Sequence, residues 1–322
     1  MNKQRTLIVI IFLCWMHSNL TAGVNPAAFL NKGVGARALG MGGAFTAVAD
    51  DATAAYWNPA GLGNLEGYHS SFMLQRLSSA VWPGIEDITP TYQYFNIIIP
   101  SNKLKLFSRG TIGMSAILFG MNNIPHTYVD SSGALHRDVF KDTESAYYIS
   151  IGYPLLPNNS ICVGGSFKYI SQVYSGIEGG SAWGWDVDMG MLLKLKDNLN
   201  VGLVANKGPE LNWESGYTDQ DSLRIKLGSS YRYDINEKMN ILGACDLIQK
   251  KDMPLKSSMG IEFTFLPEIG NINRFNTASV RAGVDKLAIE NRYNNISKLN
   301  RHINWNVGAG IDVGIYLFDL QI

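Results

Sequence analysis

The chain has 322 residues, of which 46% are hydrophobic and 17% charged, and its formal net charge is zero. The charged fraction lies below the roughly 25% of ordinary soluble domains, which indicates a protein with much apolar surface. The neutral charge balance argues against a nucleic-acid partner. The three cysteines form no CxxC pair and no metal-ligand spacing, so neither a metal site nor a cofactor is expected.

Residues 1–22 are predicted to be a secretory signal peptide. Lys3 and Arg5 supply the positively charged start, and the apolar run from Leu7 to Met16 is too short to span a membrane as a helix. Small residues before and at Ala22 offer a cleavage point after that residue. An uncleaved anchor is the alternative. A signal peptide implies that the chain is exported.

Residues 23–66 are predicted to be a compact plug, or hatch. Their glycine cluster permits close backbone packing and positive φ angles. Asp50 or Asp51 can cap a short helix over residues 52–56, and Asn58-Pro59 can end that helix and start a further turn. The segment is too small to be a domain, so it needs a cavity to fill.

From residue 67 onward, large apolar residues alternate with small or polar ones in many short runs. In one run, for example, Trp185 and Val187 alternate with Asp186 and Asp188. Because successive side chains of a strand point to opposite faces, each run has one apolar and one polar face. The predicted strands cover residues 68–79, 91–99, 110–121, 144–153, 160–174, 181–195, 198–206, 222–233, 239–249, 256–265, 277–286, 303–313 and 315–322.

Period two alone does not distinguish a soluble β-fold, whose apolar face points inward, from a membrane barrel, whose apolar face contacts lipid. The signal peptide, the charge-poor polar face rich in Gly and Ser, and the alternation of short and long connections all favour the membrane. The predicted fold class is all-β, a transmembrane antiparallel β-barrel over residues 67–322, with the hatch inside its lumen. The barrel is expected in the lipid of a bacterial outer membrane, with connections 122–143 and 207–221 outside the cell.

The number of strands raises a question. About thirteen strands can be placed, whereas bacterial outer-membrane barrels have even strand numbers. The residues from Ile315 to Ile322 have the sequence pattern of a strand. We therefore expect a barrel of about 14 strands whose final strand is missing through truncation, and a miscounted hairpin is the alternative.

The two faces of the strands give two further expectations. Aromatic residues near strand ends should form girdles at the membrane interfaces. These residues are Tyr92, Tyr94, Tyr147, Tyr148, Trp183, Tyr231, Tyr233 and Trp305. Charged residues on the polar face should line the lumen as an ion network, formed by Lys168, Asp186, Asp188, Arg224 and Lys226.

The run over residues 33–62, GVGARALGMGGAFTAVADDATAAYWNPAGL, resembles the opening of the PorV/PorQ family, relatives of the FadL long-chain fatty acid channels. The triplet Asn58-Pro59-Ala60 matches the NPA that FadL-type proteins carry in their hatch. Further agreement covers nearly the whole mature chain, at residues 163–170, 201–206, 281–285, 308–311 and 317–319. The resemblance implies a barrel of about 14 strands with the N-terminal segment inside it.

A ligand is expected to bind between the hatch and the barrel wall, and residues of the hatch are expected to control its passage. These residues are Gly40, Gly42, Gly43, Phe45, Asp50, Asp51, Asn58, Pro59 and Ala60. Elsewhere, His126 and His136 share a connection with two aspartates, and ordinary solvated residues are a better interpretation than a metal site, because nothing fixes a ligand geometry. No catalytic arrangement of Ser and His residues is recognised in the predicted strands, so enzymatic activity is not expected.

Three functions are compatible with these features. The resemblance to FadL favours passive passage of a hydrophobic small molecule, with movement of the hatch opening the route. PorV-like members of the family serve type IX secretion, which instead implies contact with exported proteins or subunits of the secretion machine at the external connections. The third hypothesis is a structural outer-membrane protein with a sealed lumen.

Overall fold

The computed structural model describes residues 26–76, 90–130, 132–251, 253–266, 277–288, 304–313 and 316–321. The predicted signal peptide and nearly all of the connection over residues 287–302 lie outside these ranges. Within the described part of the chain, no helix is both long enough and apolar enough to cross a membrane.

Short helices come first, and strands make up most of the remaining described chain. The helices are η1 (Ala28–Asn31), α2 (Ala36–Gly40), α3 (Ala54–Trp57) and η2 (Pro59–Asn64). The strands are β1 (His69–Arg76), β2 (Thr91–Pro100), β3 (Thr111–Val129), β4 (Leu135–Pro154), β5 (Ile161–Ser175), β6 (Ser181–Lys196), β7 (Leu199–Asn206), β8 (Glu210–Trp213), β9 (Thr218–Gln220), β10 (Arg224–Asn236), β11 (Met239–Lys250), β12 (Lys256–Phe265), β13 (Thr277–Ala288), β14 (Asn304–Val313) and β15 (Tyr316–Gln321).

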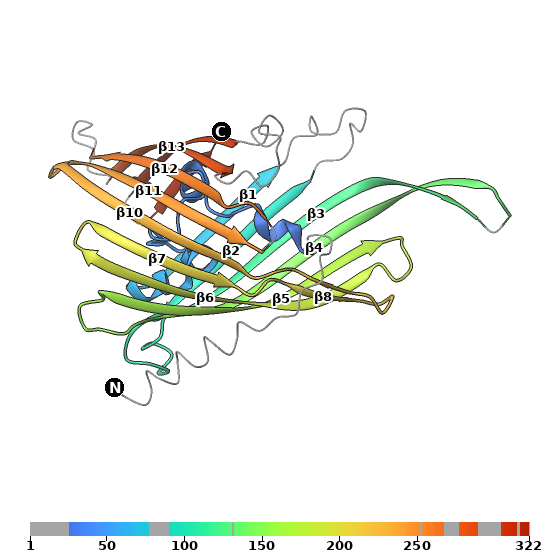
Figure 1. The fold of residues 1–322 in the computed structure, drawn as a ribbon, viewed down its shortest axis with the longest axis horizontal. Coiled ribbons are helices and arrows are strands. Elements are labelled where there is room, and N and C mark those ends of the chain that lie inside the picture. Colours follow the sequence, from blue (N-terminus) through green and yellow to red (C-terminus); the bar gives the residue numbers. More distant parts are fainter. Residues whose placement is uncertain are drawn as a thin grey trace.

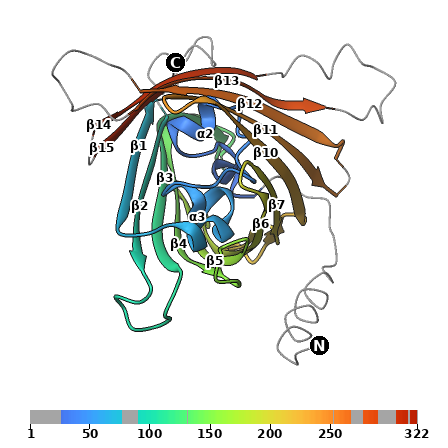
Figure 2. The ribbon, with the colours of Figure 1, turned by 90° about the vertical axis from the view of Figure 1, so that its left-hand side faces the viewer.

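These strands belong to one antiparallel sheet. Consecutive strands pair from β1 to β7 and from β10 to β15, and β7 pairs directly with β10. The short strands β8 and β9 leave this path, because β8 pairs with one end of β6 and β9 pairs with β8. The sheet curls around the N-terminal helices (Figure 1, Figure 2).

The predicted antiparallel strands are confirmed, and two of the predicted connections contain strand residues that the sequence did not indicate. Residues 122–143 contain the outer part of a long hairpin, because β3 and β4 continue pairing from Ile124↔Phe140 to Val129↔Leu135 beyond a bulge. This part of the hairpin carries mixed polar and apolar residues, so the alternation that reveals the other strands is absent from its sequence. Residues 207–221 likewise contain β8 and β9.

The concave side of the sheet is rich in polar groups and the convex side is apolar. On β5, Lys168 is 6% exposed, whereas its neighbours Phe167 and Tyr169 are 53% and 46% exposed. On β6, Asp186 and Asp188 are buried. A soluble sheet shows the reverse arrangement, with its apolar face buried, so this distribution suits a sheet whose convex side contacts an apolar medium.

The predicted aromatic girdle is wrong for three of its members. Tyr92, Tyr94 and Tyr148 are almost completely buried on the concave side, where they pack with residues of the N-terminal helices. Their neighbour Tyr147 points outward and is 52% exposed. Alternation along a strand assigns successive side chains to two opposite faces. It does not show which face is concave when both sets of residues contain aromatic side chains.

Closure of the sheet into a barrel stays a prediction, as does a final closing strand. The pairings among the described residues join β1 to β2 at one edge and β15 to β14 at the other. The described sheet is therefore a curled sheet with the strand order that an up-and-down barrel requires.

Candidate functional site

The N-terminal segment, defined here as residues 26–65, lies on the concave side of the sheet (Figure 2). Helix α2 contacts β13, β14 and β15, and η2 contacts β3, β4, β5 and β6. The segment therefore touches strands near both ends of the strand order. Its role as a movable hatch stays a prediction.

Glycines on the concave side permit this close packing. At each of them, an added Cβ atom would come closer than 3.0 Å to the N-terminal segment, which real Cβ atoms essentially never do. We call this set the inner glycines: Gly152 on β4, Gly164 on β5, Gly190 on β6, Gly202 on β7, Gly228 on β10, Gly260 on β12 and Gly283 on β13. The backbone of the segment thus lies directly against the backbone of the sheet.

Two buried polar side chains join the N-terminal segment to the sheet. Asp246 on β11 accepts hydrogen bonds from the backbone N–H groups of Phe45 (3.1 Å) and Thr46 (3.0 Å). The amide of Asn58 donates to the carbonyls of Thr46 (2.8 Å) and Met191 (3.2 Å). Asn58 also accepts from the N–H of Ala60 at 3.1 Å, so the predicted turn after α3 is confirmed.

Arg37 on α2 is the main charged link to the sheet. Its guanidinium donates two hydrogen bonds of 2.9 Å to the carboxylate of Glu262 on β12. It also pairs with Asp50 and, at 3.4 Å, with Asp51. Arg281 on β13 contacts the same carboxylate of Glu262. Arginine suits this position because its planar donors match a carboxylate in two parallel bonds.

The predicted cap by Asp50 or Asp51 is not formed. Helix α3 begins at Ala54 after Thr53, and Asp51 instead accepts hydrogen bonds from the N–H (2.8 Å) and the hydroxyl (2.6 Å) of Thr53. Burial raises the pKa of the Asp51 carboxyl, and the charge of Arg37 acts in the opposite direction. The aspartates therefore connect the segment to Arg37 and to the turn before α3.

The predicted glycines of the segment lie at its tightest contacts. Gly42 and Gly43 have φ angles of 64° and 72°, in the left-handed region that favours glycine. A Cβ on Gly42 would meet the backbone of Val284. Gly40 lies against β14, and the Phe45 ring contacts Trp57 edge-on, with 6.1 Å between their centroids. Pro59 and Ala60 are buried against β5.

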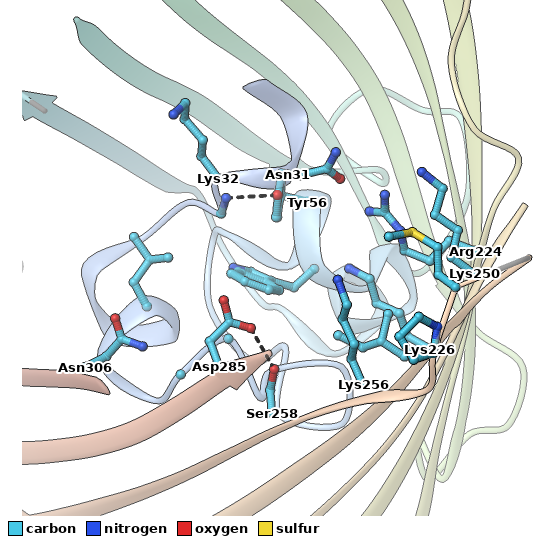
Figure 3. Close-up of a pocket in the computed structure, with 18 of the residues that line it drawn as sticks. Asn31, Lys32, Tyr56, Arg224, Lys226, Lys250, Lys256, Ser258, Asp285 and Asn306 are labelled. Atoms are coloured by element: carbon cyan, nitrogen blue, oxygen red, sulfur yellow. Dashed lines mark hydrogen bonds between the residues drawn. The ribbon is translucent and has the colours of Figure 1, made fainter. Parts of the chain in front are cut away.

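A cavity of about 450 Å³ lies between the N-terminal segment and strands β10 to β14 (Figure 3). Part of its lining is apolar, from Leu39, Trp57, Ile248, Met253 and Pro254. Another part is cationic, from Lys32, Arg224, Lys226, Lys250 and Lys256. Asp285 supplies a carboxylate and accepts a hydrogen bond from Ser258 at 3.0 Å. A cavity of this size and mixed lining is typical of small-molecule sites.

Tyr56 forms one wall of this cavity and is held in place by backbone groups. Its hydroxyl donates to the carbonyl of Leu30 (2.5 Å) and accepts from the N–H of Gly33 (3.1 Å). Burial raises the pKa of the Tyr56 hydroxyl to about 12. The hydroxyl is therefore protonated at neutral pH, as its donated hydrogen bond requires.

The five charged residues predicted to line the lumen surround one small second cavity of about 30 Å³. Lys168 forms ion pairs with Asp186 (2.9 Å) and Asp188 (2.6 Å). Arg224 lies 3.9 Å from Asp221, a residue that the sequence analysis did not single out. The side chains of Arg224 and Lys226 line both cavities, so the two cavities share part of their walls.

Sequence reasoning missed Arg37, Asp246, Glu262 and the inner glycines. The sequence shows that glycine is frequent on the polar face of the strands. The alternation of side chains does not show which of these glycines contact the N-terminal segment. The pairing of Arg37 with Glu262 spans 225 residues and leaves no local pattern. Lys250 and Lys256 flank a short connection, where charged residues are ordinary and give no signal of a cavity.

Comparison with known proteins identifies the fold. No protein-family model and no curated protein matches the sequence. A solved structure titled TodX monoaromatic hydrocarbon channel, in a deltaS2 mutant form, has a TM-score of 0.52 at 12% identity, covering 88% of this chain and 89% of that chain. The toluene transporter TodX of P. putida has a TM-score of 0.50 at 11% identity, with the same coverage.

The fold of this chain is therefore similar to that of TodX. The identity is low, so the likeness extends to the fold and not to the ligand. The resemblance to the PorV/PorQ family stays a prediction.

Proposed function

We propose that this chain is an outer-membrane protein that lets a small molecule with an apolar part cross the membrane. Residues 23–66 serve as the hatch, and the cavity of about 450 Å³ receives the molecule. The observation that carries the proposal is the position of this cavity between the N-terminal segment and the sheet. Any movement of the segment changes the cavity, so binding and passage are coupled there.

Two further observations support the proposal. The convex side of the sheet presents large apolar side chains such as Phe95, Ile149 and Trp183 to its surroundings, as lipid contact requires. The fold is similar to that of TodX, whose structures are titled as a transporter and a channel. The apolar part of the cavity lining, with Leu39 and Trp57, suits a ligand with an apolar part.

Replacing Gly42 and Gly43 with leucine is expected to change uptake of a hydrophobic probe while the sheet still forms. Both positions have positive φ angles, and a side chain at Gly42 would meet the backbone of Val284. The segment must therefore shift where it borders the cavity. Uptake by proteoliposomes measures the effect, and Gly243→Leu is the control because a Cβ on Gly243 meets nothing within 4 Å. Unchanged uptake in the double variant contradicts the hatch role.

One observation favours protein capture as a second candidate function. The β3–β4 extension, defined as residues 124–140, projects beyond the rest of the sheet (Figure 1). β2 pairs with β3 only up to Gly120, and β5 pairs with β4 only up to Lys141. Among the described residues, both edges of the extension thus lack a neighbouring strand. Unpaired edges of this kind bind extended peptides by strand addition.

Replacing the β3–β4 extension with a short turn distinguishes this function from the first. If the extension captures exported proteins, the shortened protein loses its cross-links to them in its own membrane, while binding of small molecules in the cavity is unchanged. A matched control shortens the connection over residues 101–110 at another part of the sheet. Equal cross-linking of the shortened and the unaltered protein contradicts the capture role.

A further inference from the structure

We propose that the cavity of about 450 Å³ binds a phosphate group, carried by a molecule with a short apolar part. The inference rests on the proposed function, because it names the class of molecule that the same cavity takes. Such a molecule matches the charge of the lining, the position of Lys226 and the apolar surface beside the cations.

The described lining of the cavity contains more cationic than anionic side chains. Among the described residues, five cationic side chains line it, from the N-terminal segment and from strands β10, β11 and the start of β12, together with the carboxylate of Asp285. Asp221, outside this lining, pairs with Lys250 at 2.5 Å and lies 3.9 Å from Arg224. Asp246 and Asp188, also outside this lining, attract Lys226 electrostatically. The described lining itself therefore presents more cationic than anionic side chains to a bound molecule, which favours an anion.

The burial of Lys226 gives a further indication of an anion. Its side chain is only 9% exposed and lines the cavity. Within the described part of the chain, its ammonium group forms no hydrogen bond and no ion pair, and it lies 5.5 Å from the centroid of the Trp57 ring. A buried charge is costly unless it is paired, and a ring contact offsets only part of that cost. An anion in the cavity supplies the missing partner.

The geometry favours phosphate over a single carboxylate. Arg224 and Lys226 lie two residues apart on β10, so both side chains point to the concave side (Figure 3). Lys256 extends toward the same space from the neighbouring wall (Figure 3). A phosphate monoester carries a charge of about −1.5 to −2 at neutral pH, with three acceptor oxygens that several donors can share. Lysine binds phosphate as a point charge, and arginine adds a planar donor pair.

The apolar part of the ligand has a surface to contact in the same cavity. Leu39 and Trp57 from the N-terminal segment, and Ile248 with Pro254 from the sheet side, line the cavity together with the cations. Burial of apolar area against them contributes to affinity roughly in proportion to the area removed from water. A phosphorylated molecule with an alkyl part satisfies both types of lining, whereas free phosphate satisfies only the cationic one.

Calorimetric titration of the full chain in non-ionic detergent tests the inference with four soluble probes: hexyl phosphate, hexanoate, 1-hexanol and inorganic phosphate. Hexyl phosphate is expected to bind roughly tenfold or more tightly than hexanoate or hexanol, the ratio expected for additional charged hydrogen bonds. Added salt should weaken binding of hexyl phosphate and leave hexanol binding unchanged, because salt screens charge but not apolar contact. This comparison needs no variant.

Two variants assign the effect to Lys226. Lys226→Gln is expected to weaken hexyl phosphate binding by roughly tenfold and to leave hexanol binding unchanged, and Lys226→Arg retains most of the affinity because it keeps the charge. Lys103→Gln is the matched control, since Lys103 is exposed in a turn far along the chain from the cavity. Unfolding curves of each variant show whether a lost affinity reflects a lost fold.

The outcomes separate this inference from the proposed function. Equal binding of hexyl phosphate and hexanol, or of hexyl phosphate and hexanoate, would overturn the phosphate assignment while the proposed function stands. Inorganic phosphate binding as tightly as hexyl phosphate would support the phosphate site, assign it to the free ion, and contradict the apolar part of the proposed ligand. Binding of none of the four probes would overturn both.

Discussion

Replacing Arg37 with methionine is expected to release the N-terminal segment from β12 and to lower the free energy of unfolding by about 3 kcal/mol. The guanidinium joins Glu262 through two hydrogen bonds and also pairs with Asp50 and Asp51. Its removal leaves Glu262, whose side chain is 6% exposed, with Arg281 as its remaining ion-pair partner. Because Glu262 keeps this contact with Arg281, we expect a loss of unfolding free energy at the lower end of the range for a broken buried ion pair.

Tryptophan fluorescence during denaturant unfolding measures the loss in Arg37→Met, and limited proteolysis of the N-terminal segment measures its release. Arg137→Met is the matched control, because Arg137 lies exposed on the β3–β4 extension. Arg37→Lys should recover only part of the stability, since lysine cannot form two parallel bonds to a carboxylate. An Arg37→Met protein as stable and as protease-resistant as the control contradicts this account.

Replacing Gly164 with alanine is expected to cost about 3 kcal/mol, the upper end of the range for overpacking. The added Cβ would overlap the carbonyl of Pro59 and approach the N–H of Ala60. Both are backbone atoms of η2, which also contacts β4 and β6, so they cannot move without the whole turn. The displacement should loosen the Asn58-Pro59-Ala60 turn and increase leakage of small solutes.

The neighbouring glycine provides a matched control for Gly164→Ala. A Cβ on Gly165 would point to the other face of β5, where the nearest atom is the carbonyl oxygen of Asp188 at an ordinary 3.6 Å. Gly165→Ala should therefore be close to neutral in both unfolding and leakage measurements. If the two variants unfold alike, the inner glycines do not determine the packing of the N-terminal segment.

The strands could be predicted from the sequence because strand formation here depends on a local pattern. The run over residues 181–195, for example, corresponds to β6, Ser181–Lys196. The pattern failed in the β3–β4 extension, where backbone pairing continues without apolar alternation. It also failed for Tyr92 and Tyr94, because the direction in which a side chain points depends on what packs against that face.

Part of the candidate site could also be predicted locally. The turn at Asn58-Pro59 follows from the backbone limits of proline and from the ability of asparagine to bond its own chain. The alternation on β6 likewise placed Asp186 and Asp188 on the polar face, where both now pair with Lys168 of β5. These features depend on residues close together in the chain or on the period of a single strand.

The amino-acid sequence by itself determined the strands, the polarity of their faces and the turns of the N-terminal segment, because these follow from local backbone preferences and from period two. Only the tertiary structure decided which glycines contact that segment, which carboxylate binds Arg37, and which cations border the cavity. Arg37 and Glu262 lie 225 residues apart. Such contacts depend on how the sheet curls and on the exact register of its strands, and neither leaves a pattern within a short stretch of sequence.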